Sequence, residues 1–317
     1  MNEEVTRRMR TQIEFCQQLQ RSGSIVTWDA TVDRHAQTVK NLITVLNQPE
    51  FEDNPDKQGL TERLDALLKR CMDSDFQIAF VGAIKAGKST LINAILGQDI
   101  ASTRVTPETA VLTKFRHSKE YYVKVKFYTQ EEWDKLWKDI SNQGDVFKQE
   151  YAERKGAEHQ AEWVGHGDYQ RTLSTNEMKA ELERWSSSKH PEHYFVKEIE
   201  VGLPTLNLPE NVIFVDTPGL DDPVKYRSDV TDHYIMQANA VFVCVTAHAM
   251  TGEEIRTIGK AFGRSSSPDK VFIIGTQVDN LNFPLRDWET QKKEWVKYLK
   301  EETCYGSEKS AEEHILP

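Results

Sequence analysis

The sequence lacks any long run of apolar residues. Its most apolar stretches, such as residues 241–245 and 271–275, have the length of a β-strand, whereas a helix that spans a membrane needs about 20 predominantly apolar residues. Residues 1–10 carry charges of both signs and lead into no apolar segment like that of a secretory signal peptide. We therefore expect any membrane contact of this chain to be peripheral.

Cysteine is scarce as well. The chain of 317 residues has 4 cysteines, at positions 16, 71, 244 and 304, without a C-x-x-C pair. Disulfide frameworks and zinc sites need clustered ligands, so we expect free thiols in a reducing, cytoplasmic setting. Neither His190 with His193 nor His159 with His166 has a neighbouring cysteine or a cluster of carboxylates, and we expect these histidines to be solvated.

Positive charge is in deficit. The chain has 40 lysines and arginines against 50 aspartates and glutamates, which gives a net charge of −10. An acidic protein repels polyanions, so we expect no nucleic-acid partner. With 38% apolar residues the chain can bury a large core, and its length exceeds that of one ordinary domain. We therefore expect two units.

The spacing of apolar residues changes near residue 75. Residues 1–74 carry apolar side chains at helical spacing, from Val39 to Leu46 and again from Leu60 to Leu68, and a further helix is expected over residues 3–20. We predict an N-terminal helical segment of the neck or bundle type; a packing extension of the next domain is the alternative. Over residues 75–317, short β-branched runs alternate with helical patterns, which is typical of an α/β domain with a mostly parallel central sheet.

Charged, helix-forming sequence interrupts this alternation over about residues 129–193. Thr129 with Glu132, and Ser174 with Glu177, have the spacing of capping boxes at helix starts. We predict a helical insertion into the α/β domain. Just before it, residues 122–128 alternate apolar residues with lysines, which predicts a strand at the edge of the sheet with one solvated face.

A glycine-bounded loop follows the first predicted strand. Residues 82–89 read G-x-x-x-x-G-K-S and open an amphipathic helix, which is the pattern of a phosphate-binding loop. Unpaired N–H groups at the helix start attract phosphate, and glycines let the backbone approach it closely. We predict that Lys88 reaches the β- and γ-phosphates and that Ser89 ligates a Mg²⁺ ion held by the same phosphates. The other residues that we expect at the nucleotide are Gly82, Ala83, Ile84, Lys85, Ala86, Gly87 and Thr90.

A second motif, D-T-P-G at residues 216–219, directly follows an apolar strand. We predict that Asp216 holds the Mg²⁺ ion through water and that the N–H of Gly219 senses the γ-phosphate. Between the two motifs, residues 105–111 contain the expected switch threonine, which closes onto the Mg²⁺ ion and the attacking water. Thr109 is the first candidate and Thr106 the second; a polar loop before a strand is the alternative.

Residues 276–279, T-Q-V-D, follow another apolar strand and have the position of the guanine-reading element N/T-K-x-D. The carboxylate of Asp279 can accept hydrogen bonds from the N1–H and N2–H₂ groups of guanine together, which adenine does not offer. GTP is therefore favoured over ATP, with Thr276, Gln277 and Asp279 at the base. Gln277 replaces the usual lysine of this element, which predicts a weaker affinity for the base.

Together the runs GAIKAGKSTLINAILG, TPETAVLT, DTPGLDDP and TQVD resemble the GTPase domain of bacterial dynamin-like proteins. The resemblance covers roughly residues 76–317, and the helices before it resemble the segment that joins the stalk. It implies a large, low-affinity GTPase that hydrolyses GTP with Mg²⁺ and pairs through its GTPase domain as a GTP-dependent homodimer. It also implies membrane remodelling or secretion, with a peripheral membrane or protein partner.

The chain departs from this family at two places. Dynamins carry a Gln-Ser pair where Ile84 and Lys85 stand, and the related guanylate-binding proteins have an arginine finger at the position of Lys85. We hypothesise that the Lys85 ammonium supplies this charge; a solvated lysine on the rim of the loop is the alternative. The sequence also ends at a strand-like segment, residues 314–317, where the family continues into a last base-contacting loop. We therefore expect a GTPase domain truncated before that loop.

The leading hypothesis is a dynamin-like GTPase whose turnover is coupled to self-association. The alternative is a low-turnover, GTP-controlled switch or scaffold that recruits a protein partner through the N-terminal helices or the insertion. Ile84 and Gln277, which replace the residues usual in dynamins, favour this alternative. An ATPase is a third hypothesis. Asp221 and Asp222 are expected, by resemblance, to contact a partner GTPase domain.

Overall fold

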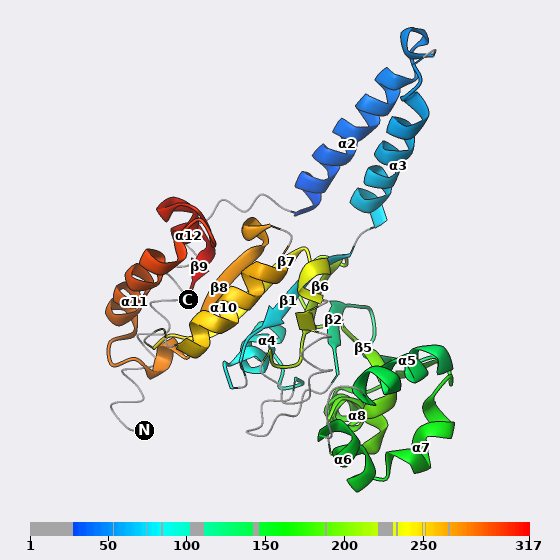
Figure 1. The fold of residues 1–317 in the computed structure, drawn as a ribbon, viewed down its shortest axis with the longest axis vertical. Coiled ribbons are helices and arrows are strands. Elements are labelled where there is room, and N and C mark those ends of the chain that lie inside the picture. Colours follow the sequence, from blue (N-terminus) through cyan, green and yellow to red (C-terminus); the bar gives the residue numbers. More distant parts are fainter. Residues whose placement is uncertain are drawn as a thin grey trace. The chain divides into compact units, whose positions relative to one another are not determined.

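The chain divides into two compact units, Met1–Asp75 and Phe76–Pro317 (Figure 1). The computed structural model describes residues 28–52, 54–73, 75–83, 85–101, 111–141, 146–187, 189–220, 231–232, 234–248, 250, 252–265 and 267–317. The helix expected over residues 3–20 lies outside these ranges. No helix in the described ranges is both long enough and apolar enough to cross a bilayer.

Two helices that pack against each other make up the described part of the first unit (Figure 1). These are α2 (Trp28–Leu46) and α3 (Lys57–Asp73), joined through the short 3₁₀ helix η1 (Pro49–Phe51). Ala36 and Val39 are buried, whereas Leu42 and Leu67 remain about half exposed. The helical spacing of apolar residues in the sequence therefore corresponds to two helices. Packing of one helix against the other buries only part of their apolar surface.

The described residues of the second unit form a nine-stranded sheet in the order β4-β3-β5-β2-β6-β1-β7-β8-β9. Its strands are β1 (Phe76–Val81), β2 (Thr113–His117), β3 (Tyr122–Phe127), β4 (Asp168–Thr172), β5 (Val196–Leu203), β6 (Val212–Asp216), β7 (Ala240–Thr246), β8 (Val271–Thr276) and β9 (Ile315–Leu316). The run from β6 through β1 and β7 to β9 is parallel, whereas β2 pairs antiparallel with β6, and β3 pairs antiparallel with both β4 and β5. The expected α/β fold with a mostly parallel central sheet is confirmed.

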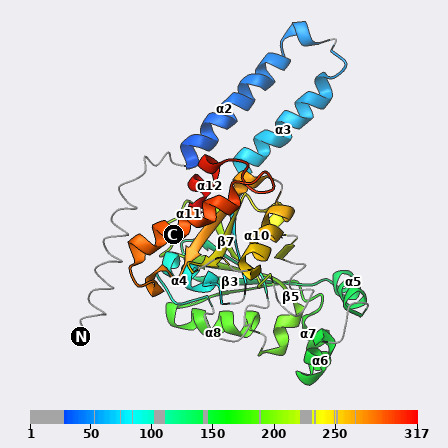
Figure 2. The ribbon, with the colours of Figure 1, turned by 60° about the vertical axis from the view of Figure 1, so that its left-hand side comes forward.

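Helices pack against both halves of the sheet. In the described ranges they are α4 (Lys88–Leu96), α5 (Gln130–Ser141), α6 (Val146–Glu153), α7 (Gly156–Trp163), α8 (Thr175–Ser186), α10 (Gly252–Arg264), α11 (Pro284–Leu299) and α12 (Glu308–His314), with the 3₁₀ helices η2 (Pro191–Phe195), η3 (Pro268–Lys270) and η4 (Val278–Asn280). Helix α10 packs against β7 and β8, and α8 packs against β3 and β5 (Figure 2). The β-branched residues of β7 and β8 are buried, among them Val241, Val243, Val271 and Ile273.

The middle of this core is aromatic. Phe80 of β1 is fully buried and meets Phe214 of β6 and Phe242 of β7 edge to face, with ring centroids 5.3 Å apart in each pair. Edge-to-face pairs at this distance stabilise a core beyond the area that they bury. These ring contacts therefore join β1 to its two neighbours, β6 and β7, at the middle of the sheet.

The prediction of an edge strand at residues 122–128 is wrong. Strand β3 pairs with β5 on one side and with β4 on the other. Strand β4 falls within residues 129–193, where only helices were expected. Its sequence, Asp-Tyr-Gln-Arg-Thr, is largely exposed and carries no alternation of apolar residues, so that only its pairing with β3 reveals it. A short, charged strand is typical of a protected sheet edge.

Other local predictions for this region hold. Both capping boxes form: the Thr129 N–H donates to Glu132 while the Glu132 N–H donates to the Thr129 hydroxyl, and Ser174 and Glu177 make the same exchange. Lys124 on the solvated face of β3 pairs with Asp168 of β4 at 2.9 Å. Among the described cysteine side chains, Cys244 and Cys304 are free thiols.

Candidate functional site

The loop between β1 and α4 is shaped by its glycines. Gly82 has φ of +156°, and a Cβ atom there would lie 2.6 Å from the carbonyl oxygen of Cys244 on β7. Gly87, with φ of +87°, caps the start of α4. Side chains are excluded at the first position by contact and disfavoured at the second by backbone conformation. The loop therefore lies close against β7 and leads directly into the helix N-terminus.

Lys88 and Ser89 begin helix α4. The Lys88 ammonium donates to the carbonyls of Gly82 and Ala83, both at 3.0 Å, so it lies inside the curve of the loop. The hydroxyl of Ser89 donates to Oδ2 of Asp216 at 3.3 Å. Strand β6, which carries Asp216 at its carboxyl end, lies next to β1. Because β1 and β6 are parallel, the two motifs, distant in sequence, both lie at the carboxyl ends of these strands.

Asp216 is a buried acid in an unusual environment. Its side chain is 2% exposed, and its Oδ1 atom has no hydrogen-bond partner among the described residues. Burial raises the pKa of Asp216 to about 6, although the Lys88 charge and the Ser89 hydroxyl act in the opposite direction. A buried polar atom without a partner calls for an explanation. A carboxylate oxygen beside a serine hydroxyl is a donor set that fits Mg²⁺, which at a nucleotide is bound by one or two carboxylates together with phosphate oxygens and water.

The residues after Asp216 are tied to strand β1 and to the loop that follows it. The Thr217 hydroxyl donates to the carbonyl of Phe80 at 2.8 Å, and the Leu220 N–H donates to the carbonyl of Gly82 at 3.2 Å. Gly219 lies between these two anchors. The candidate residues Ile84, Thr106 and Thr109, as well as Asp221 and Asp222, lie outside the described residues.

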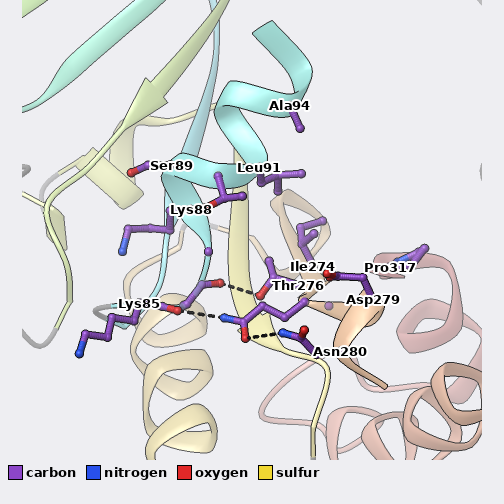
Figure 3. A pocket seen from close by; sticks show the side chains of 15 residues that line it. Lys85, Lys88, Ser89, Leu91, Ala94, Ile274, Thr276, Asp279, Asn280 and Pro317 are labelled. Carbon is purple, nitrogen blue, oxygen red and sulfur yellow. Dashed lines mark hydrogen bonds between the residues drawn. The ribbon is translucent and has the colours of Figure 1, made fainter. Parts of the chain in front are cut away.

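The base-reading candidates lie at the end of β8, facing the same loop (Figure 3). The Thr276 hydroxyl donates to the carbonyl of Ala86 at 2.6 Å and to that of Val245 at 3.1 Å. The amide of Gln277 donates to the carbonyl of Lys85 at 3.2 Å. Asp279 is exposed on the short helix η4.

A cavity of about 720 Å³ lies between the two loops, a volume suited to a small-molecule ligand. Of the predicted residues, those that line it are Lys85, Ala86, Gly87, Lys88, Ser89, Thr90, Thr276, Gln277 and Asp279. Gly82, Ala83, Asp216 and Gly219 are not among its lining residues. The phosphate and base candidates thus share one space.

Sequence reasoning missed several residues of the cavity wall. They are Leu91, Ala94, Ile274, Gly275, Asn280 and Pro317. Leu91 and Ala94 follow Lys88 by three and six positions on α4, so helical periodicity could have placed them on the same side. Asn280 adjoins Asp279, and its amide donates to Gln277 at 3.4 Å. Nothing local in the sequence marks Ile274 or Pro317.

A metal site of another kind is not indicated. In the ranges that the structure describes, no group of three or more histidine, cysteine, aspartate and glutamate side chains could hold a metal ion. His193 is buried with its Nδ1 at 2.6 Å from the carbonyl of His190. It is therefore a packed histidine, in contrast to the solvated one expected from the sequence.

Comparisons with known proteins agree on a family. The sequence model of the dynamin family matches residues 78–276. Dynamin-like protein 1 of Campylobacter jejuni is 31% identical over 205 residues, which cover 63% of this chain and 26% of that protein. A bacterial dynamin-like protein of Nostoc punctiforme is 27% identical over 179 residues, 56% of this chain and 21% of the relative. The chain therefore spans about a quarter of the length of these relatives.

A solved structure is similar in fold. A chain from an oligomerised bacterial dynamin pair, described as a mechanism for long-range sensing and tethering of membranes, superposes with a TM-score of 0.54 at 22% identity. The match covers 93% of the present chain and 40% of that chain. At this identity the likeness concerns the arrangement of helices and strands alone.

Proposed function

Because the chain belongs to the dynamin family of GTPases, we propose that it binds GTP together with Mg²⁺ and hydrolyses it to GDP and phosphate. One observation carries the proposal: Lys88 and Ser89 line the same cavity as Asp279. The groups that we assign to phosphate and to guanine thus face one space. The volume of about 720 Å³ accommodates a nucleotide.

The residues of the loop and of α4 bind the triphosphate. The N–H groups at the start of α4 offer hydrogen bonds to phosphate oxygens, and the helix dipole favours their negative charge. The Lys88 ammonium, now bonded to two loop carbonyls, can turn to the β- and γ-phosphates. At the other end of the cavity, the Asp279 carboxylate selects guanine over adenine.

Ser89, Asp216 and Thr109 are the residues that we assign to Mg²⁺. The unpartnered Oδ1 of Asp216, next to the Ser89 hydroxyl, supports this assignment. When bound, the ion neutralises charge on the phosphate oxygens. Thr109 is assigned on the sequence pattern alone.

Hydrolysis is an in-line attack of water on the γ-phosphate. The N–H of Gly219 and the hydroxyl of Thr109 orient the water, and Lys88 and Lys85 balance the charge that develops on the phosphates. No side chain acts as a strong base, because in phosphoryl transfer the barrier falls mainly through positioning and electrostatic stabilisation. The finger role of Lys85 is supported by its place among the residues that line the cavity.

We extend the proposal to partners. Residues 1–74 form a neck-like helical segment, residues 75–317 form the GTPase domain with its insertion at about residues 129–193, and two copies pair through that domain when GTP is bound. The protein acts in the cytoplasm and binds a membrane peripherally. The family, and the description of the similar bacterial pair as membrane-tethering, support this part of the proposal.

The test begins with titration calorimetry of the intact, magnesium-supplemented protein with GTP and, separately, with ATP. We expect heat with GTP and a much weaker response with ATP; no response to any guanine nucleotide contradicts the proposal. Turnover per molecule is then measured over a range of protein concentrations. A rise with concentration supports an enzyme that pairs, whereas flat turnover near zero supports the switch or scaffold.

A further inference from the structure

Two side chains join the base-reading turn to the phosphate-binding loop, and a third bonds to one of them (Figure 3). Thr276 and Gln277 donate to two consecutive carbonyls of the loop, those of Ala86 and Lys85. Asn280 then donates from its own amide to Oε1 of Gln277. We call this set of hydrogen bonds the loop clamp. The clamp connects residues 190 or more positions apart in sequence.

Gln277 occupies the centre of the loop clamp. Its Nε2 atom donates to the Lys85 carbonyl at 3.2 Å while its Oε1 atom accepts from Asn280 at 3.4 Å. Both ends of the amide are therefore engaged. Flipping the amide would exchange its donor and its acceptor, so both hydrogen bonds require the same orientation. A lysine at this position has donors and no acceptor, so it could not serve Asn280 in the same way.

The backbone at both ends of this contact is unusual. Among the described residues, the non-glycine residues with positive φ are Lys85 at 67°, Lys155 at 56° and Gln277 at 58°. Two of the three are thus the partners in one hydrogen bond. Left-handed backbone is unfavourable for a residue with a Cβ atom and persists where surrounding contacts impose it. The Gln277 amide is such a contact.

We propose that Gln277 is a positioning residue for guanine recognition, whose amide holds the turn carrying Asp279 at a fixed place relative to the phosphate-binding loop. The proposal rests on the proposed function. It replaces the expectation that the loss of lysine simply weakens the base site, because the glutamine makes a contact of its own with the loop. Selectivity for guanine depends on this contact, since the carboxylate must meet the base of a nucleotide whose phosphates are already held.

The test compares variants of the full chain with Mg²⁺. Gln277→Met keeps the length of the side chain and removes its donor, and Gln277→Lys keeps a donor for the Lys85 carbonyl. Gln291→Met on α11, outside the residues that line the cavity, is the matched control. For each protein, dissociation constants for GTP and for ATP, the KM and kcat for GTP, and the melting temperature are measured.

With Gln277→Met we expect GTP binding to weaken by about tenfold, which is the effect of one lost hydrogen bond. ATP binding should change by less than about twofold, because ATP does not use the Asp279 contact, and this difference sets a positioning role apart from general loosening. KM should rise while kcat stays. Gln277→Lys should recover most of the GTP affinity, and Gln291→Met should match the original protein.

Equal weakening of GTP and ATP overturns the proposal, and so does unchanged GTP affinity in Gln277→Met. If Gln277→Met melts at a markedly lower temperature, Gln277→Asn is the second test. Asparagine tolerates left-handed backbone but is too short to reach the Lys85 carbonyl. The proposal therefore requires Gln277→Asn to lose GTP selectivity to the same extent. Absence of GTP binding in the unaltered chain contradicts the proposed function itself, which separates the two failures.

Discussion

At the scale of single residues, Asp216 is a buried acid whose pKa is shifted by its surroundings. Burial raises its pKa from 3.8 to about 6. Between pH 3.8 and about pH 6, Asp216 is therefore protonated in the folded chain and ionised in the unfolded chain. Folding is therefore favoured at low pH, and this contribution is lost as the pH rises through 6. At neutral pH the ionised carboxylate opposes folding by about 3 kcal/mol.

Replacing Asp216 with asparagine should therefore stabilise the protein without nucleotide. We expect the free energy of unfolding at pH 7.5 to rise by about 1–3 kcal/mol, with a much smaller gain at pH 4, where the acid is already protonated in the folded chain. Urea denaturation at both values checks this. Asp65→Asn, on the exposed surface of α3, should change little at either pH. A variant less stable than the original protein at pH 7.5 would contradict the assignment.

Lys85 supplies a second prediction at this scale. Its side chain is exposed while its carbonyl is held by Gln277, so truncating the side chain leaves the loop clamp in place. We expect Lys85→Ala to lower kcat for GTP by about 1,000-fold or more, in line with the value of a cationic finger, with GTP affinity nearly unchanged. Lys85→Arg should retain most of the activity. If single-turnover assays show Lys85→Ala hydrolysing GTP at the original rate, the finger hypothesis is abandoned.

At the scale of secondary-structure elements, close approach of helix α11 to strand β8 supports the wall of the cavity. A Cβ atom at Gly275 would lie 2.2 Å from the Trp288 ring of α11, a distance that no side chain tolerates. Trp288 itself is 2% exposed and meets Trp295 edge to face. The end of β8, which leads into Thr276 and Gln277, is thus fixed by packing from behind.

Gly275→Ala should therefore destabilise the protein by about 2–3 kcal/mol, because the buried indole has to move. Gly259→Ala in α10 is the control: a Cβ there meets nothing within 4 Å, and alanine in a helix is favoured over glycine by up to about 1 kcal/mol. The two midpoints of urea denaturation should shift in opposite directions. A shift of Gly275→Ala toward higher urea would show that α11 does not pack as described.

At the scale of the whole molecule, the two compact units have separate roles in the proposal. All residues that line the cavity belong to the second unit, from Lys85 to Pro317. The apolar core described around Phe80 also belongs to that unit. Nucleotide binding should therefore require none of residues 1–75.

A chain of residues 76–317 should bind GTP with a dissociation constant within about twofold of the full chain and should unfold in one cooperative step, since a single core supports it. Fluorescence titration with a labelled GTP analogue and circular dichroism on heating measure these properties. Loss of GTP binding by a folded 76–317 fragment would show that the first unit contributes to the site.

The sequence by itself determined the local features: the phosphate-binding loop at residues 82–89, both capping boxes and the α/β alternation. Each is encoded within a few consecutive residues, because helix starts and tight loops depend on nearby side chains. The family followed from the same short motifs. Their roles in binding and catalysis stay predictions.

Only the tertiary structure decided which distant groups meet. Ser89 and Asp216 are 127 positions apart, and Gln277 and Lys85 are 192 positions apart; sheet order, not local pattern, brings each pair together. The same holds for β4, whose polar residues form a strand because β3 offers an unpaired edge. Burial of Asp216 is likewise a product of packing, since a side chain's exposure depends on every element that covers it.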